Sequence, residues 1–436
     1  MTQEPLWDLG FETIKELETD LGILASGREE IYGCIFGRDS LITSLKLLRV
    51  YENTQDIYFL QLVKKILMNL ASLQGKEVNI ESGEEPGKCI HEYRPHNHRH
   101  LTKDIPRPWY IYPDNIMRNY DSLDSTPLFL ITCYRYYQLS NDNTFIKTHS
   151  DKIEQALRWL LDNSDSNGDG FLDYELHRDR KHGGLVTQSW MDSAESVFHE
   201  DGSPVAFPIA PVEAQSYAFL AFKLWSTFYK TTNLALGIEL GSRAVQLKQA
   251  FNAAFIVPDA CGLILAAGVD GNGKLLTNAR SAMGHCLWAS LEEHRDGITE
   301  AIINDEYIPH IVERLMKPDL FEPHAGIRTL SSLSRSYSPN SYHNGSIWPH
   351  DTSIVASGMD NFGYHKQSSQ IRSALMLALN HFQTPIELFV YDQSGYSEYC
   401  SVLGQRACKK QAWAAASLLK EVTTSHQTVE ASQVLP

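Results

Sequence analysis

The recurrence of apolar residues at intervals of three and four constrains the fold of this chain more than any other feature. This spacing is the period of an amphipathic helix, and it returns in many separate stretches. It predicts helices over residues 40–51, 57–73, 126–139, 153–161, 212–229, 236–255, 282–293, 301–315, 352–359, 368–381 and 411–421. Stretches that alternate apolar and polar residues, as half-buried strands do, are scarce. The sequence therefore predicts an all-α protein.

We expect the helices to pair as hairpins and to close into a barrel. No sequence repeat of fixed period is visible and no Pro/Gly/Ser-rich linker divides the chain, so an open helical solenoid fits less well than a closed barrel. At 436 residues the chain is long enough for one large barrel or for two domains. We predict a single catalytic domain over residues 1–422, followed by a polar, flexible tail over residues 423–436.

The charge of the chain excludes two classes of partner. With 53 acidic and 38 basic residues, its formal charge of −15 repels phosphate backbones and anionic membrane surfaces. Neither a nucleic acid nor a membrane is therefore an expected partner. The N-terminus lacks the pattern of a secretion signal, and the 7 cysteines show no CxxC spacing, which is typical of free thiols in a reducing compartment. We expect a cytoplasmic protein.

The segments between the predicted helices are long and carry most of the Trp, His, Asp and Gly residues, as loops that form a site do. The most informative of them contains Trp190-Met191-Asp192. An apolar wall raises the pKa of a carboxyl group, and an acid that is still protonated near neutral pH can donate its proton to a leaving oxygen. In the alternative interpretation Asp192 caps a helix and Trp190 packs in the core.

Two candidates for a second carboxylate, Glu387 and Glu398, precede the last predicted helix. Glycoside hydrolysis uses two carboxyl groups that face each other across the scissile bond, and their distance along the sequence is no obstacle. The motifs of serine hydrolases (GxSxG), phosphate-binding loops (GxxxxGK[ST]) and dinucleotide-binding folds (GxGxxG) are absent. A pair of carboxylates is thus the best-supported chemistry.

Three further segments contain candidate sugar-binding residues. Arg38 and Asp39 stand just before a predicted helix, where they serve either as a cap or as a pair that grips adjacent hydroxyls. His91 and Glu92 begin a histidine-rich stretch that fits a solvated or sugar-facing loop better than a zinc site. Segment 342–351 contains, ahead of a helix, Trp348, His350 and Asp351, which form either a ligand wall or a core Trp with a cap.

Segment 165–173 resembles the first nine positions of a calcium-binding loop, with oxygen ligands at alternating places. Its candidate ligands are Asp165, Asn167, Asp169 and Asp173. The twelfth position, where such a loop has a glutamate, is Leu176. An Asx-type turn explains the Asp and Gly content equally well. We expect no cofactor other than this candidate calcium ion.

A set of short motifs in a fixed order, from about Tyr32 to Leu419, resembles the amylo-alpha-1,6-glucosidase family, the glucosidase part of glycogen debranching enzymes, within the six-hairpin glycosidases. The motifs are Phe-Gly-Arg-Asp-Ser at 36–40, Asp-Ser-Thr-Pro-Leu-Phe at 124–129, Asn-Gly-Asp-Gly-Phe at 167–171, Trp-Met-Asp-Ser at 190–193, Val-Glu-Ala-Gln at 212–215, Gly-Ile-Arg-Thr-Leu at 326–330, residues 345–351, Glu-Leu-Phe at 387–389 and Gln-Ala-Trp at 411–413. The resemblance implies an (α/α)6 barrel whose loops form a pocket for a terminal sugar.

The resemblance also implies an inverting mechanism in which Asp192 is the general acid and Glu387 the general base, with Glu398 as the rival base. For such a mechanism the two carboxyl groups should lie about 6.5–9.5 Å apart. The resemblance further implies that Arg38 and Asp39 grip the sugar. The remaining candidates for contact with the substrate are His91, Glu92, Asp124, Trp190, Glu213, Gln215, Trp348, His350 and Asp351.

These observations predict an inverting, exo-acting α-glycoside hydrolase that removes a terminal glucosyl or similar unit from an oligosaccharide, a branched glucan or a small glycoside. Debranching enzymes carry a large region before the barrel that this chain lacks, so a short glycoside fits at least as well as glycogen. One alternative is a hydrolase of mannosylglycerate or glucosylglycerate, with Arg280 or Arg328 holding the carboxylate. Another is a sugar epimerase or isomerase that uses histidines, and the last is a non-catalytic sugar-binding protein. The candidate histidines are His91, His324, His343 and His350.

Overall fold

The computed structural model describes residues 4–103, 105–293 and 298–433, and within them an inner ring of helices is surrounded by outer helices. Each helix of the inner ring packs against the next, and the last packs against the first, so the ring is closed. In ring order the inner helices are α2 (Gly37–Thr54), α5 (Ser125–Ser140), α7 (Val212–Tyr229), α9 (Ala282–Trp288), α11 (Pro349–Asn361) and α13 (Ala412–Gln433). This arrangement confirms the predicted (α/α)6 barrel.

Each inner helix packs against one outer helix. In five of the pairs the outer helix follows the inner one along the chain, whereas in the sixth the last helix packs against the first. The outer helices are α3 (Ile57–Ser72), α6 (Asn143–Asp162), α8 (Leu234–Ala254), α10 (Ile308–Leu315), α12 (His365–Phe382) and α1 (Glu4–Leu17), and a single turn, α4 (Arg99–Thr102), lies in a loop. Outer helices bury one face, as α6 does with Ile153, Leu157 and Leu160. Its N-terminus is capped by Asp142, which accepts a hydrogen bond from the backbone N–H of Phe145 at 2.9 Å.

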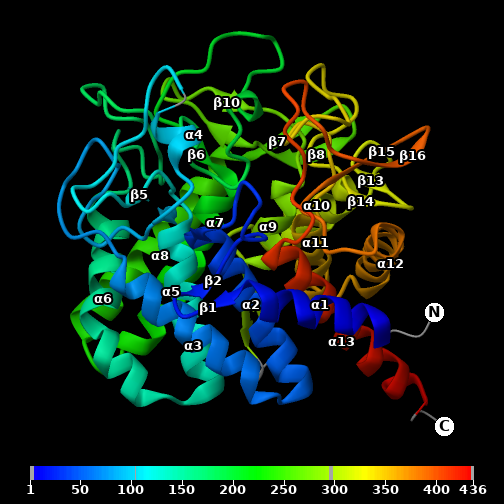
Figure 1. Cartoon of the computed structure of the whole chain (residues 1–436), viewed down its shortest axis with the longest axis horizontal. Helices are drawn as coiled ribbons and strands as arrows, with labels where there is room; N and C mark the ends of the chain where they lie inside the picture. Colours follow the sequence, from blue (N-terminus) through cyan, green and yellow to red (C-terminus); the bar gives the residue numbers. More distant parts are fainter. Residues whose placement is uncertain (1–3, 104, 294–297, 434–436) are drawn as a thin grey trace.

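Short strands join the helices, and most of them lie with the long loops on the upper side of Figure 1. Two three-stranded antiparallel sheets have the orders β3-β4-β5 and β10-β9-β6. Their strands are β3 (Ile35–Phe36), β4 (Glu92–Arg94), β5 (Met117–Asn119), β6 (Ala210–Pro211), β9 (Gly268–Val269) and β10 (Leu275–Leu276). Since β3 leads directly into α2 and β6 into α7, the sheets fix the N-terminal ends of two inner helices.

The other strands form five antiparallel hairpins. They are β1 (Glu18–Thr19) with β2 (Gly22–Ile23), β7 (Ile256–Asp259) with β8 (Gly262–Leu265), β11 (Leu291–Glu293) with β12 (Ile298–Glu300), β13 (Phe321–Glu322) with β14 (Gly326–Ile327), and β15 (Phe389–Asp392) with β16 (Gly395–Glu398). Two short 3-10 turns, Ala194–Ser196 and Asp305–Tyr307, complete the regular structure of the described residues. None of the helices in the described part of the chain is long and apolar enough to cross a membrane.

The structure adds helix α1, which was not predicted, and it corrects four predicted helix boundaries. Helix α6 begins at Asn143, where the sequence predicted a start at residue 153. Helix α9 ends at Trp288, where residues up to 293 were predicted as helix, because Asn361 of α11 donates to the Trp288 carbonyl at 3.2 Å and to the Ser290 hydroxyl at 2.9 Å. Helix α10 begins only at Ile308, after a 3-10 turn. Helix α13 continues to Gln433, so the segment predicted as a tail from residue 423 is helical over most of its length.

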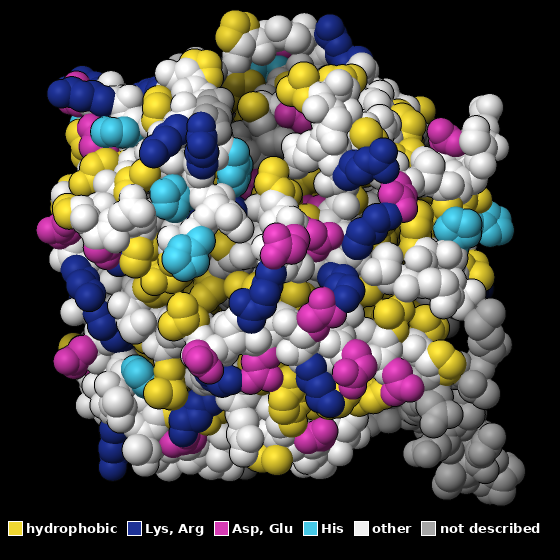
Figure 2. Space-filling view, viewed as in Figure 1, with side chains coloured by type: hydrophobic (Ala, Val, Ile, Leu, Met, Phe, Trp, Pro, Cys, Tyr) yellow, Lys and Arg dark blue, Asp and Glu magenta, His cyan; other side chains and the backbone are white. Residues whose placement is uncertain are grey.

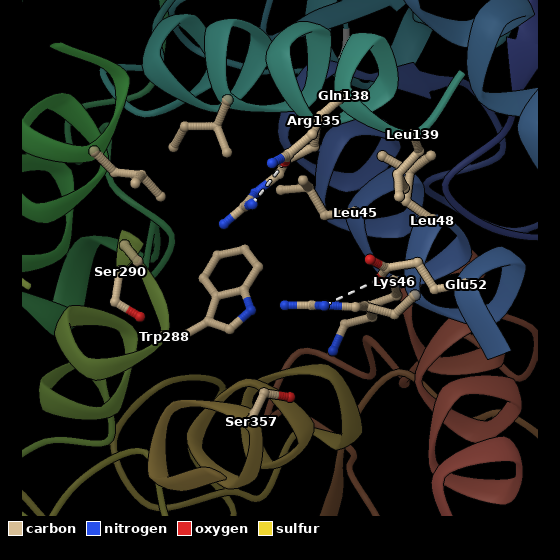
Figure 3. A pocket seen from close by; sticks show the side chains of 14 residues that line it. Leu45, Lys46, Leu48, Glu52, Arg135, Gln138, Leu139, Trp288, Ser290 and Ser357 are labelled. Carbon is tan, nitrogen blue, oxygen red and sulfur yellow. Dashed lines mark hydrogen bonds and ion pairs between the residues drawn. The ribbon is translucent and has the colours of Figure 1, made fainter. Parts of the chain in front are cut away.

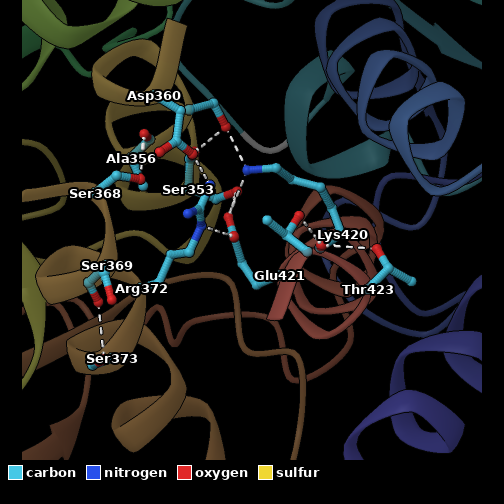
Figure 4. Close-up of polar contacts among 12 residues, drawn as sticks. Ser353, Ala356, Asp360, Ser368, Ser369, Arg372, Ser373, Lys420, Glu421 and Thr423 are labelled. Atoms are coloured by element: carbon cyan, nitrogen blue, oxygen red, sulfur yellow. Dashed lines mark hydrogen bonds and ion pairs between the residues drawn. The ribbon is translucent and has the colours of Figure 1, made fainter. Parts of the chain in front are cut away.

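A buried ionic cluster fixes α13 against α11 and α12 (Figure 4). Glu421 of α13 is fully buried and accepts from Arg372 Nε at 2.8 Å, from Lys420 Nζ at 2.8 Å and from the Ser353 hydroxyl at 2.6 Å. Arg372 also pairs with Asp360. Burial raises the pKa of Glu421, but Lys420 and Arg372 outweigh it and hold this pKa at about 2.

We predict that Glu421→Gln lowers the free energy of unfolding by about 3–5 kcal/mol at neutral pH, because Arg372 and Lys420 then lose a buried counter-charge. A carboxyl group with a depressed pKa contributes its stability above its ordinary pKa and loses it as the pH falls. The difference in the free energy of unfolding between wild type and variant should therefore decrease as the pH falls from 4.5 toward about 2. Urea unfolding over this range measures it.

The matched control is Glu239→Gln, which breaks an exposed ion pair with Arg158 at 2.9 Å. We expect it to change the free energy of unfolding by at most about 1 kcal/mol. Equal losses in the two variants would contradict the role of the buried cluster.

Candidate active site

A pocket of about 380 Å³ lies where the N-terminal ends of α2, α11 and α13 meet the loops. This volume falls in the range of about 300–1,000 Å³ that is usual for small-molecule sites. Aromatic rings make up half of the lining, which consists of Tyr32, Phe36, Arg38, Asp39, Trp190, Asp192, Tyr342, His343, Trp348, Glu387, Gln411 and Trp413. In the space-filling view, the loop side of the molecule is hollowed near its top (Figure 2).

A second pocket, of about 710 Å³, lies toward the C-terminal ends of the inner helices (Figure 3). Its lining contains Lys46, Arg135 and Trp288 among aliphatic side chains. Among the described lining residues Glu52 is the acid, and it pairs with Arg49 at 2.9 Å. Because two facing carboxyl groups are needed for the predicted chemistry, the first pocket is the candidate site.

Arg38 connects Asp192 to the barrel. Its Nη1 donates to Asp192 at 2.9 Å, its Nε to Asp124 at 2.7 Å and its Nη2 to the Ser189 carbonyl at 2.8 Å. The side chains of Arg38 and Asp124 are buried, whereas that of Asp192 is 25% exposed toward the pocket that it lines. Burial raises the pKa of Asp192 above its ordinary value, against the opposing charge of Arg38.

Glu387 enters the same pocket from the segment just before β15 and is 1% exposed. The Tyr342 hydroxyl donates to its Oε1 at 2.5 Å, and the backbone N–H of Cys408 donates to its Oε2 at 2.8 Å. Burial raises the pKa of Glu387 to about 7, although both hydrogen bonds favour the charged form and limit the rise. Glu387 is therefore a carboxyl group that gains and loses its proton near neutral pH.

Asp39 interacts with both of these groups. Burial raises its pKa to about 8, Arg38 opposes the rise, and the charges of Asp192 and Glu387 add to it. Burial raises the pKa of Tyr32 above its ordinary value, and the charges of Glu387 and Asp192 add to this rise. Asp192 and Glu387, separated by almost two hundred residues in the sequence, are therefore brought to one pocket. Their separation of about 6.5–9.5 Å stays a prediction.

Glu398, the rival candidate, lies outside this pocket. It ends the surface hairpin β15–β16, where its side chain is 39% exposed. It pairs with Lys409 and lies 3.9 Å from Arg406. The geometry therefore favours Glu387, because Glu398 is held by surface cations away from the lining residues.

Several residues predicted to contact the substrate instead support the pocket from behind. Glu213 accepts from the backbone N–H of Trp190 at 3.3 Å, and Gln215 bonds both the N–H and the carbonyl of Leu172. Asp124 holds Arg38, as described above. None of the three lines the pocket, because each faces a backbone group or a cation beneath it.

His91, Glu92, His350 and Asp351 are also absent from the lining. Glu92 pairs with Arg94 at 2.6 Å, and His91 packs edge-on against Phe36 with the ring centres 5.3 Å apart. His350 and Asp351 are fully buried in the first turn of α11. The structure corrects these four assignments, since sequence proximity to an aromatic residue does not distinguish the surface of a pocket from the layer below it.

The two arginines considered for a carboxylate-bearing substrate do not line the pocket either. Arg280 is buried and donates to the carbonyls of His343 at 2.9 Å and Ser196 at 2.6 Å. Arg328 pairs with Glu322 at 2.7 Å. His324, a candidate for an epimerase, also lies outside the lining.

The residues of the candidate calcium loop bond to the backbone of the loop. Asp165 accepts from the N–H groups of Gly168 at 2.7 Å and Gly170 at 2.9 Å, and Asp173 accepts from that of Ser166 at 3.1 Å. Asp169 accepts from Phe171. These are the contacts of Asx-type turns. Across the described residues, no group of three or more His, Cys, Asp or Glu side chains is arranged to hold a metal ion.

The sequence analysis did not identify part of the lining, namely Tyr32, Phe36, Tyr342, Gln411 and Trp413. His343, which also lines the pocket, was named only as a candidate for the epimerase alternative. A signal for them was present. Gln411 and Trp413 begin the last inner helix, and Tyr342 and His343 adjoin the segment of Trp348. Residues at the N-terminal ends of inner helices, where these helices converge on the loops, are those that a barrel of this kind brings to its pocket.

Comparison with known proteins supports the fold and the class of enzyme. A family model described as the mannosylglycerate hydrolase MGH1-like glycoside hydrolase domain matches residues 299–386, and the sequence matches no curated protein. This matched family is not the amylo-alpha-1,6-glucosidase family. The matched family model is described as a glycoside hydrolase domain, which supports the predicted class of enzyme.

Solved structures with the same fold share little sequence with this chain. The GH63 mannosylglycerate hydrolase from Thermus thermophilus in complex with Tris is 13% identical, with a TM-score of 0.60 over 95% of this chain and 99% of that one. Its complex with Tris and D-glycerate gives a TM-score of 0.62 at 12% identity over the same shares. A Streptococcus pneumoniae metal-independent alpha-mannosidase, in a non-productive complex with alpha-1,6-mannobiose, is 13% identical, with a TM-score of 0.60 over 96% and 94% of the two chains.

Proposed function

We propose that the chain is an inverting, exo-acting α-glycoside hydrolase with Asp192 as general acid and Glu387 as general base. The observation that carries this proposal is that both carboxyl groups line one pocket, each with a raised pKa. Asp192 gives its proton to the glycosidic oxygen as the bond to the anomeric carbon breaks. Glu387 takes a proton from the water that attacks the opposite face of the sugar, so the anomeric configuration inverts.

The shape of the pocket supports cleavage at a chain end. Its small volume and its aromatic walls suit a single sugar ring, with Trp190, Trp348 and Trp413 presenting apolar surface. Arg38 and Asp39 are the charged groups that stand beside the catalytic pair. The three inner helices that begin at the pocket direct the positive ends of their dipoles toward it, which favours the charged forms of its carboxylates.

Two classes of substrate are candidates, one supported by the pocket lining and the other by the matched family model. An uncharged glycoside is favoured by the lining. Among the described lining residues Arg38 is the Lys or Arg side chain present, and its three nitrogens already donate to Asp124, Asp192 and the Ser189 carbonyl. A mannosyl- or glucosylglycerate is favoured by the matched family model. The amylo-alpha-1,6-glucosidase activity suggested by the ordered motifs belongs to the first class.

A panel of substrates followed by proton NMR tests the reaction. The panel contains isomaltose, maltose, a glycogen limit dextrin, trehalose, sucrose, alpha-1,6-mannobiose, mannosylglycerate and glucosylglycerate. We expect hydrolysis of at least one of them, with the β-anomer of the released sugar appearing first because water attacks opposite the α-linked leaving group. First appearance of the α-anomer would contradict inversion, and no hydrolysis of any member would contradict the proposed function.

Replacement of either catalytic carboxyl group should abolish most of the activity and leave the fold intact. We expect Asp192→Asn and Glu387→Gln each to lower kcat by about 10²–10⁴-fold, which is the usual contribution of general acid or base catalysis. The matched control is Glu398→Gln, since Glu398 lies on the surface hairpin. A loss in Glu398→Gln as large as in Glu387→Gln would reverse the assignment of the base.

The pH dependence of kcat/KM should report the proton on Glu387. The base must be charged, so activity should rise as the pH increases through about 7. Tyr342→Phe removes a hydrogen bond to the charged form and should shift this limb by about one unit to higher pH. Tyr396→Phe, on hairpin β15–β16, should leave it unchanged. A limb that stays in place in Tyr342→Phe would contradict the assignment.

A further inference from the structure

Three inner helices bring a tyrosine, a histidine and an aspartate together beneath the pocket. Tyr217 of α7 lies 2.5 Å from Nδ1 of His285 in α9, and Nε2 of His285 lies 2.8 Å from Oδ1 of Asp351 in α11. All three side chains are fully buried, and none of them lines the pocket. They cannot touch a substrate, so any effect on the reaction passes through other residues.

The donors and acceptors of this cluster can be assigned from chemistry. A carboxylate oxygen accepts hydrogen bonds, so Nε2 of His285 carries the hydrogen and donates to Asp351. In this assignment Nδ1 is the acceptor, and Tyr217 donates to it. Burial raises the pKa of Tyr217 well above its ordinary value, which keeps its hydroxyl group protonated. The cluster therefore holds the His285 ring in one tautomer and one plane.

The ring of His285 lies against Trp190. The two rings are stacked, with centres 5.6 Å apart and planes 10° apart. The backbone N–H of Trp190 is held by Glu213 of α7 at 3.3 Å. Both the ring and the backbone of Trp190 are thus fixed by inner helices, two residues before Asp192.

Stability alone is a weak reason for this cluster. A buried polar or ionic set is often no more stabilising than apolar residues of the same volume. Within the described residues, Oδ2 of Asp351 has no hydrogen-bond partner, and burying such an atom destabilises the folded protein. What the cluster does provide is a fixed surface under the segment that carries the general acid.

We propose that His285, held by Tyr217 and Asp351, is a positioning residue for Asp192 and acts through Trp190. This inference rests on the proposed function of the pocket. It gives Asp351 a role other than the sugar contact expected from the sequence. A displaced Trp190 would move Asp192 relative to the glycosidic oxygen and leave Glu387, which is held by Tyr342 and Cys408, in place.

The test uses the leaving group, because a fluoride ion departs without a proton and an alcohol does not. In hydrolysis of an α-glycosyl fluoride the carbon–fluorine bond breaks, water adds to the anomeric carbon, and Glu387 still takes the proton from water. A misplaced general acid therefore slows hydrolysis of a glycoside and spares that of a fluoride. A disturbed barrel or a disturbed base slows both.

The variants are Asp351→Asn, which keeps the volume but can hold the opposite tautomer of His285, and Tyr217→Phe, which removes one hydroxyl group. The substrates are the glycosides of the panel above, α-D-glucosyl fluoride and α-D-mannosyl fluoride. For the glycoside that wild type cleaves, we expect kcat to fall by about 10–100-fold in Asp351→Asn, and by less in Tyr217→Phe, because small displacements of a catalytic group have effects of this size. Hydrolysis of the fluoride should stay within about threefold of wild type, as it should in Asp192→Asn.

The matched control is Asp270→Asn. It breaks the buried pair of His199 and Asp270, whose atoms are 3.1 Å apart and which lies away from the pocket lining. We expect it to leave the ratio of glycoside to fluoride rates unchanged. Equal losses on both substrates in Asp351→Asn and Tyr217→Phe, or no loss on either, would overturn the positioning role while wild-type activity stands. A wild type that cleaves neither glycosides nor fluorides would overturn the proposed function itself.

Discussion

The buried guanidinium of Arg38 is the interaction on which the site depends. It joins the first turn of α2 to Asp124 at the start of α5 and to the segment that carries Asp192. A buried arginine needs full compensation of its charge, and the two carboxylates and the Ser189 carbonyl supply it. The same contacts that make this cation tolerable in the barrel thus bring the proposed acid to the pocket and set its direction.

The fold was predictable because it depends on a local signal. A period of three to four residues is present within each helix, and the closed ring of inner helices with its outer layer follows from the number and order of such helices. The helix ends were less predictable. Helix α9 stops where Asn361, more than seventy residues away, bonds its last turn. That contact exists only after folding, so the sequence around Trp288 carries no sign of it.

The site, like the fold, was predictable only in part. Asp192 was identified from its apolar neighbours and from the order of motifs. Glu387 was identified from the order of motifs, with Glu398 as its rival, and Asp192 and Glu387 both line one pocket. Whether the other candidate residues line the pocket or lie buried beneath it could not be predicted from the sequence. Asp351 stands three residues after Trp348, yet only the tryptophan lines the pocket. Trp348 precedes α11 in an extended conformation, whereas Asp351 lies within the first turn of the helix and its side chain meets His285. Burial depends on the partners from α7 and α9, which the local sequence does not contain.

The layer beneath the pocket sets a condition on how the proposed hydrolase would handle a long substrate. Under the lining, the fully buried ring of His350 stacks on Trp413, and Lys46 donates to the His350 carbonyl at 3.2 Å. Among the described residues, this layer lies between the pocket and the barrel axis. Under the proposed function, the released sugar therefore leaves through the opening by which the substrate entered. A polymer would then have to dissociate after each cleavage, so the proposed enzyme would act distributively and shorten all chains of a mixture in parallel.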